Sequence, residues 1–143
     1  GGNEIVSAAK ALKKKKLLGF LADQDGYIHG LPVPFLGQPS SAVVGPATFA
    51  KKFGSPVVPI FTSRKPEGGH IVHILPPLHY NNSGDDDVDM YTLTEECVRV
   101  TEDFIREHPD EWIWFQHRWM TKMSEIVDYY KKLEIRERAH EKQ

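Results

Sequence analysis

The stretch "SPVVPIFTSR", residues 55–64, is apolar, rich in β-branched residues and closed by one arginine. Val57 to Thr62 is therefore typical of a buried strand. A second run, "LLGFLA" at residues 17–22, is also unbroken and apolar. Such a run is typical of a strand covered on both faces, as in a parallel sheet. Together the two runs predict neighbouring buried strands in an α/β fold.

A third strand is predicted directly after residues 55–64. In "GGHIVHIL", residues 68–75, alternate residues would form the two faces of a strand, His70, Val72 and Ile74 on one face and Ile71, His73 and Leu75 on the other. The turn "KPEGG", residues 65–69, is short, so these two strands should pair antiparallel. The predicted sheet is thus small and mixed, with helices flanking it.

Two helices are predicted around the first two strands. The first shows an apolar stripe at helical spacing formed by Ile5, Ala8, Ala9 and Leu12. The second runs from about Ala42 to Phe53, with Gly54 as its stop. Because Pro46 fits best in a first turn, this helix is alternatively expected to begin near Gly45.

Two more helices are predicted in the second half. Thr92 and Glu95 have the spacing of a capping box, and the helix that follows should end near His108 and Pro109. Its buried stripe includes the single cysteine, Cys97, which we interpret as a core residue and not as a nucleophile. The last helix should start at about Thr121.

The bulk properties indicate one domain over residues 1–143, with an exposed acidic loop at 81–91 and a frayed tail at 136–143. The net charge of −2 gives no sign of nucleic-acid binding. Lys13 to Lys16 form a basic run that is either a solvated helix end or a contact with anionic lipid head groups. No apolar run approaches the ~20 residues needed to span a bilayer.

The chemistry-bearing residues form no complete catalytic set. None of the seven histidines has the spacing of a helical zinc motif, and no phosphate-binding glycine loop is present, so neither a metal nor a cofactor is expected. Polar residues do follow the predicted strands, namely Asp23, Gln24 and Arg64. These residues, with Arg118 as a further candidate, make either a structural ion pair or a pocket for an anionic group, which arginine binds with two hydrogen bonds.

The remaining feature is "HPDEWIWFQHRW", residues 108–119, which holds every tryptophan of the chain. We expect it to pack the end of one helix against the sheet, with Trp112 in the core. Arg118 would then lie near the substrate edge or a membrane interface, where arginine and tryptophan are both suited.

Two stretches together resemble one family. "LADQDGYIHGLPVPFLGQPSSAVVGPATFAKKFGSPVVPIFTSR", residues 21–64, resembles the central part of the bacterial lipid A biosynthesis (lauroyl/myristoyl) acyltransferases. Residues 108–119 are similar to that family's "PEQWLW-x-H-x-RW" type of signature. The motifs agree in order and spacing over roughly residues 4–122.

The resemblance implies a glycerolipid-acyltransferase-like α/β fold and an enzyme that moves a fatty acyl chain from acyl carrier protein to a lipid A precursor. It implies a peripheral location at the cytoplasmic face of the bacterial inner membrane, in contact with the membrane surface. The family pattern carries substrate binding over to Asp23, Gln24, Arg64, His117 and Arg118.

The chain departs from the family at the catalytic base. The superfamily uses a histidine with a carboxylate five positions later, and no histidine of this chain has one. We therefore expect the C-terminal half of such an enzyme, with no catalytic residue of its own and an incomplete fold without the upstream half. The exposed apolar surface would favour a homodimer. The alternative is a non-catalytic binding or scaffold domain of the same fold.

Overall fold

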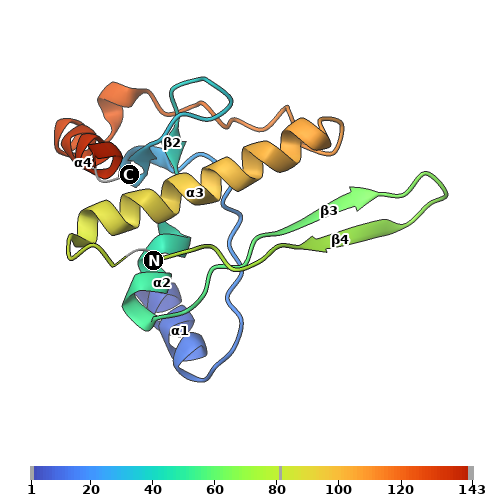
Figure 1. Ribbon diagram of the computed structural model, residues 1–143, viewed down its shortest axis with the longest axis horizontal. Coiled ribbons are helices and arrows are strands. Elements are labelled where there is room, and N and C mark those ends of the chain that lie inside the picture. Colours follow the sequence, from blue (N-terminus) through green and yellow to red (C-terminus); the bar gives the residue numbers. More distant parts are fainter. Residues whose placement is uncertain (1, 81, 142–143) are drawn as a thin grey trace.

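The computed structural model describes residues 2–80 and 82–141 and shows a mixture of helices and short strands (Figure 1). The α/β class is confirmed, but the sheet differs from the prediction. Within the described residues the strands form two separate antiparallel pairs. β1 (Leu31–Pro32) pairs with β2 (Ser41–Ala42), and β3 (Ile60–Arg64) pairs with β4 (His70–Ile74).

The β3–β4 hairpin confirms the antiparallel pairing that the short turn predicted. Its register runs from Ile60 opposite Ile74 to Arg64 opposite His70. The hairpin extends away from the helices (Figure 1), and Ile60 and Ile74 are exposed on it. The expected buried strands are therefore wrong in position, since β3 begins three residues later than predicted and is only partly covered.

The predicted strand at residues 17–22 is also wrong. These residues form no strand, and Leu17 is fully exposed. An extended segment needs a neighbour to take its backbone hydrogen bonds, and no described strand lies in register with it. It instead connects α1 (Gly2–Lys13) to the loop at residue 23, and the expected parallel pairing does not form. Ile5 of α1, expected in a buried stripe, is also exposed.

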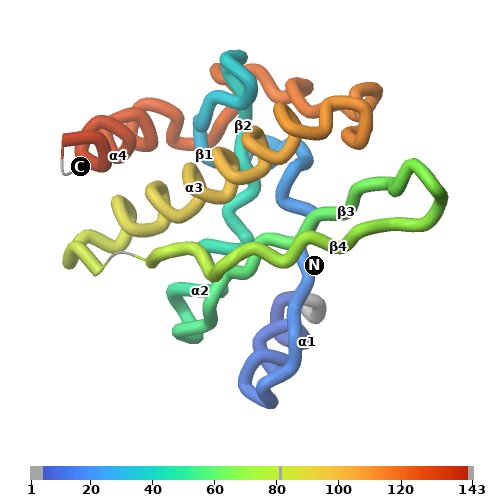
Figure 2. The backbone as a smooth tube through the Cα atoms, turned by 45° about the vertical axis from the view of Figure 1, so that its right-hand side comes forward, coloured from blue at the N-terminus to red at the C-terminus, as the bar shows by residue number. Residues whose placement is uncertain are grey.

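α2 (Gly45–Phe53) begins where Pro46 indicated, and Gly54 ends it in the left-handed conformation. It lies between α1 and α3 (Asp86–Glu107), as Figure 2 shows. Gly45 is required at the start of α2, because a Cβ there would lie 2.6 Å from the ring of Phe20. The small residues Ala47 and Ala50 pack against Leu93 of α3 and form a minor core.

The N-cap of α3 lies seven residues before Thr92, the N-cap that the capping box predicted. Asp85 is the N-cap, accepting a hydrogen bond from the Val88 amide, and the three acidic residues after it lie in the first turn. The predicted acidic loop at residues 81–91 is therefore wrong for residues 86–91. Negative charge is favourable at a helix N-terminus, so the acidic residues 86, 87 and 89 stabilise the first turn of α3.

The main core lies between α3, α4 (Tyr129–Glu141) and the segment around β1 and β2. Phe35, Tyr91 and Val98 are buried there, and the Tyr91 hydroxyl donates to the Pro32 carbonyl at 3.3 Å. Ala139 of α4 is buried in the same core, so residues 136–141 are packed helix and not the frayed tail that the sequence predicted. Residues 142 and 143 of that tail lie outside the described residues.

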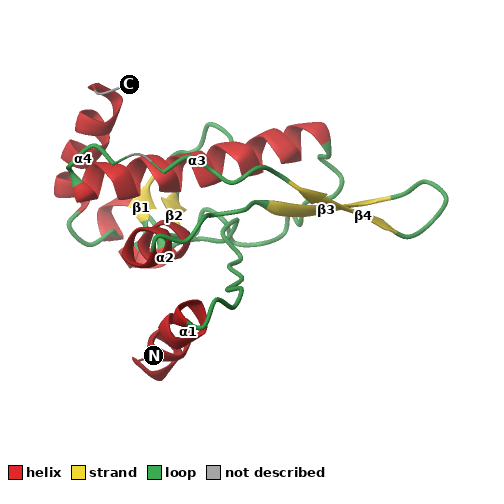
Figure 3. Ribbon diagram, turned by 60° about the horizontal axis from the view of Figure 1, so that its bottom comes forward, coloured by secondary structure: helices red, strands yellow, loops and turns green. Residues whose placement is uncertain are grey.

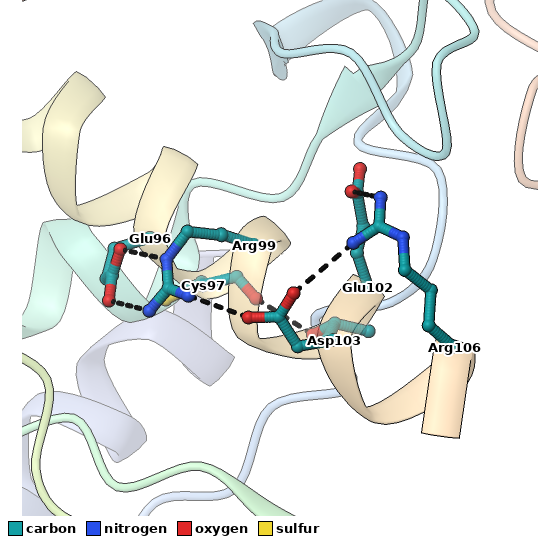
Figure 4. A network of polar contacts seen from close by, with 7 residues as sticks. Glu96, Cys97, Arg99, Glu102, Asp103 and Arg106 are labelled. Carbon is teal, nitrogen blue, oxygen red and sulfur yellow. Dashed lines mark hydrogen bonds and ion pairs between the residues drawn. The ribbon is translucent and has the colours of Figure 1, made fainter. Parts of the chain in front are cut away.

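The exposed face of α3 carries a chain of ion pairs (Figure 4). Arg99 bridges Glu96 at 2.6 Å and Asp103 at 2.7 Å, and Arg106 continues the chain to Asp103. Such pairs three or four residues apart each stabilise a helix by about 0.2–0.5 kcal/mol. The helix ends at Glu107, as the Pro109 position predicted.

The contact between α2 and α3 can be tested by truncation of Leu93, which is 1% exposed. Leu93→Ala should lower the free energy of unfolding by roughly 2–5 kcal/mol, because it removes buried methyl groups and leaves a cavity. The matched control is Glu107→Ala on the exposed surface of the same helix, expected within about 0.5 kcal/mol of the parent. Urea denaturation followed by circular dichroism measures both, and similar midpoints for the two variants would contradict this packing.

Candidate functional site

An apolar groove with a volume of about 530 Å³ lies between the 18–23 segment, α2, β3 and α3. Its walls are aromatic and aliphatic side chains, including Leu18, Phe49, Val57, Phe61, Val100 and Phe104. Two aromatic contacts shape these walls. Phe61 stacks on Phe104 with ring centroids 4.5 Å apart, and Phe20 lies against Phe49 at 5.6 Å.

Asp23 and Glu111 contribute charged groups to the lining of the groove, and we call this part of the groove its polar end. The Asp23 carboxylate accepts hydrogen bonds from the Trp112 indole at 3.1 Å and from the Gln116 side chain at 3.2 Å. Both donors come from the tryptophan segment, and Trp112 itself packs beside the main core as predicted. The structure thus places Asp23 at the groove and fixes its orientation with two donors that sequence reasoning missed.

Arg64 lies at the end of β3, and its charge is already balanced by carboxylates. Its Nε atom contacts Glu111 at 3.1 Å, and its terminal nitrogen contacts Asp110 at 3.2 Å. The Arg64 amide also donates to Glu111 at 2.9 Å. Of the two roles that the sequence left open, this geometry corresponds to the structural ion pair.

Asp23 and Arg64 are linked through consecutive residues of the tryptophan segment. Glu111 holds Arg64, and Trp112 holds Asp23. Glu111, Trp112 and Asp23 all line the groove. Asp23 and Arg64 were expected to meet at the ends of two parallel strands. In the structure the tryptophan segment bridges them, and the described strands include no parallel pair.

Arg118 is 1% exposed, which contradicts its predicted position at a substrate edge or membrane interface. Its guanidinium lies 4.5 Å from the centre of the Phe35 ring and donates to the Ser41 carbonyl at 2.8 Å. Burial lowers the pKa of Arg118, while the nearby carboxylates of Asp25 and Asp23 oppose this effect. Its Nε–H has no partner among the described residues. Arg118 is therefore an interior residue that contacts Phe35 and Ser41 and does not line the groove.

Asp25, which sequence analysis did not select, is buried and joins two segments that lie far apart in the sequence. One carboxylate oxygen accepts from the Thr121 hydroxyl at 2.6 Å, and the other accepts from the Thr121 amide at 3.0 Å. The Tyr27 amide also donates to this carboxylate at 2.6 Å. The sequence signal was the Asp-Gly turn dipeptide, but a partner 96 residues away cannot be recognised from it.

The other candidates stay apart from the groove walls. Gln24 and His117 are exposed, and their contact with a substrate stays a prediction. The His73 ring contacts the buried Ser63 hydroxyl at 2.8 Å, and His140 contacts Glu95 at 2.9 Å across α3 and α4. Gln24, His117 and the two histidines His73 and His140 do not line the groove. In residues 2–80 and 82–141, no three metal-ligating side chains lie close enough to hold an ion.

The arrangement suits binding of an apolar chain more than acid–base catalysis. Concave apolar walls favour a ligand that buries hydrocarbon, and a few placed polar groups at one end fix its orientation. Asp23, held by two donors, is such a group. Cys97 also lines the groove, and burial raises the pKa of its thiol to about 12. The thiol therefore stays protonated at neutral pH, in agreement with its interpretation as a core residue.

Comparison with known proteins gives two matches. Residues 1–121 match the model of a protein family described as bacterial lipid A biosynthesis acyltransferase. Over 122 residues the chain is 25% identical to the phosphatidylinositol mannoside acyltransferase of Mycobacterium tuberculosis. This match covers 85% of the chain and 36% of the relative, so the chain spans about a third of the length of that curated protein.

The different positions of the two arginines predict different effects on stability. Arg118→Ala should cost about 3 kcal/mol or more, because it removes a buried side chain and a positive charge that interacts with the buried Asp25 carboxylate. Arg64→Ala should cost at most about 1 kcal/mol, because the side chain of Arg64 is 60% exposed and its ion pairs are solvated. Urea unfolding measures both variants. A larger loss for Arg64→Ala than for Arg118→Ala would contradict these placements.

The state of Cys97 predicts slow alkylation. Only the thiolate reacts, and a pKa of about 12 leaves little thiolate at pH 8. Iodoacetamide should therefore modify the folded chain at least about a hundredfold more slowly than the same chain unfolded in urea, where the pKa returns to ~8.5. Mass spectrometry follows the reaction, and equal rates in the two states would show that the thiol is neither buried nor protonated.

Proposed function

The chain belongs to the bacterial lipid A biosynthesis acyltransferase family, and from this we propose that it forms the acyl-chain-binding part of an enzyme that acylates a lipid A precursor. The observation that carries the proposal is the apolar groove of about 530 Å³ with Asp23 at its polar end. In the proposed reaction acyl carrier protein delivers the fatty acyl group, and the transfer takes place at the cytoplasmic face of the inner membrane.

The groove supports this role by its chemistry. A saturated acyl chain gains about 0.8 kcal/mol for each CH₂ group removed from water, and it needs no hydrogen-bond partners along its length. The groove walls offer aromatic and aliphatic contacts, such as Phe61 and Val100. The thioester or the acceptor hydroxyl would then lie near Asp23, whose carboxylate is held by Trp112 and Gln116 and can accept a hydrogen bond.

The chain does not supply the general base in this proposal. No histidine is followed five positions later by a carboxylate, and the described His140–Glu95 contact joins the outer faces of α3 and α4 away from the groove. We therefore propose that the chain binds and orients substrate, with proton abstraction carried out by a histidine–carboxylate pair outside this sequence. On its own it would bind an acyl chain without turnover.

The acceptor has a second candidate. The relative from Mycobacterium tuberculosis is described as acting on phosphatidylinositol mannoside, and lipid A precursors are also sugar-bearing lipids. A glycolipid acceptor is the class common to both names. The polar end of the groove suits such a head group, because Asp23 and Gln116 can hydrogen-bond sugar hydroxyls.

The groove assignment can be tested by filling it. Val100→Trp places an indole into the groove and should weaken binding of the fluorescent fatty acid cis-parinaric acid about tenfold or more, equivalent to losing contact with two CH₂ groups. Fluorescence titration of the full chain measures the dissociation constant.

The matched control is Val127→Trp, which adds the same indole at an exposed position that does not line the groove. Its affinity should equal that of the parent, and circular dichroism should show the same helix content for all three proteins. If Val100→Trp binds the fatty acid as tightly as Val127→Trp, the groove is not the acyl-chain site and the proposal fails.

A further inference from the structure

α1 and the connection that follows it form an arm, residues 2–22, in which α1 projects from the body of the molecule (Figure 3) and Phe20 of the connection packs against Phe49 of α2. The arm contains five lysines and one glutamate, a net charge of +4, whereas the whole chain has a net charge of −2. The lysines are Lys10, Lys13, Lys14, Lys15 and Lys16, and all five are exposed. The arm is therefore a concentrated positive region on an otherwise acidic protein.

These charges are not used within the described structure. Among residues 2–80 and 82–141, no ion pair involves any of the five lysines. Lys15 adopts a left-handed backbone conformation with φ of 56° at the end of α1, a position where glycine is usually found. A lysine at this position therefore adopts the conformation at some energetic cost.

Large apolar side chains are exposed among the lysines. Leu17, directly after the lysine run, is 100% exposed, Leu21 is 72% exposed and Ile5 is 63% exposed. Nucleic-acid-binding surfaces combine basic residues with polar or stacking groups. Exposed leucine and isoleucine on either side of the lysines in the sequence instead match a surface that is anionic outside and hydrocarbon beneath, which is the chemistry of a lipid bilayer.

The arm also leads into the groove. Leu12 and Leu18 bracket the run from Lys13 to Lys16 in the sequence, and both line the groove. A lipid chain that leaves a bilayer beside these lysines would therefore reach apolar walls without crossing a polar barrier. None of the described helices is long and apolar enough to cross a bilayer.

We propose that residues 2–22 are the element that docks this protein on an anionic lipid surface, with Lys13 to Lys16 contacting phosphate groups and Leu17 and Ile5 entering the interface. The inference rests on the proposed function in that it names the element that meets the membrane. Its test, however, needs neither acyl donor nor acceptor.

The experiment measures binding of the full chain to vesicles by co-sedimentation. Vesicles of equal parts phosphatidylglycerol and phosphatidylcholine should bind the chain, and vesicles of phosphatidylcholine alone should bind it at least about tenfold more weakly, since each lysine near an anionic surface contributes about fivefold. The variant with all four residues from Lys13 to Lys16 changed to Gln should lose at least about tenfold in affinity for the anionic vesicles.

The charge-matched control changes four exposed lysines elsewhere to Gln, namely Lys52, Lys65, Lys122 and Lys131. It should bind the anionic vesicles as the parent does. The double variant Leu17→Ser with Ile5→Ser keeps every lysine and lies outside the groove lining, and it should also bind more weakly.

Three results would overturn the inference: no binding to anionic vesicles, equal losses for the two lysine variants, or binding of a duplex DNA oligonucleotide that depends on Lys13 to Lys16 without vesicle binding. The fatty-acid titration separates this failure from that of the proposed function. If the chain binds cis-parinaric acid in the groove but binds no vesicles, the proposed acyl-chain site stands and the lipid-docking role of the arm is wrong. If it binds vesicles but not the fatty acid, the docking role stands and the acyl-chain site is wrong.

Discussion

The buried carboxylate of Asp25 is the interaction on which the rest of the site depends. It accepts two hydrogen bonds from Thr121 and so joins the loop after residue 22 to the end of the tryptophan segment. Neither segment has a helix or sheet long enough to hold it in place, and ordering irregular backbone costs about 1–2 kcal/mol per residue. Arg118, stacked on Phe35 and bonded to Ser41, makes a second buried connection between the same two segments. These few long-range polar contacts therefore replace regular secondary structure.

This connection explains how the groove acquires a polar end. Because the tryptophan segment is held against residues 23–42, Trp112 reaches Asp23 and Glu111 reaches Arg64. The rest of the groove is formed by apolar walls from α2, β3 and α3. The molecule thus combines an apolar channel with a carboxylate of fixed orientation, and the basic arm lies at the part of the groove lined by Leu12 and Leu18. Because the chain belongs to the acyltransferase family, we propose that this groove binds an acyl chain.

Local signals in the sequence predicted the parts of the fold that have local causes. Pro46 and Gly54 gave the bounds of α2, Pro109 marked the end of α3, and a short turn gave the β3–β4 pairing. The failures have non-local causes. The apolar run at 17–22 resembles a buried strand, but an isolated run does not reveal whether a neighbouring strand exists. Arginine usually lies at the surface. The burial of Arg118 depends on Phe35 and Ser41, which lie 83 and 77 residues earlier. The acidic residues 86, 87 and 89 were predicted to lie in a loop, whereas the dipole of α3 stabilises them in its first turn.

Hydrogen exchange at the Thr121 amide tests the connection through Asp25 most directly, because this single N–H donates to the buried carboxylate at 3.0 Å. Native-state exchange measured by NMR should show this amide protected as strongly as the central amides of α3, with exchange requiring global unfolding. Exchange of the Thr121 amide at the rate of an exposed loop, while α3 stays protected, would show that the tryptophan segment is not held and that the polar end of the groove has no fixed structure.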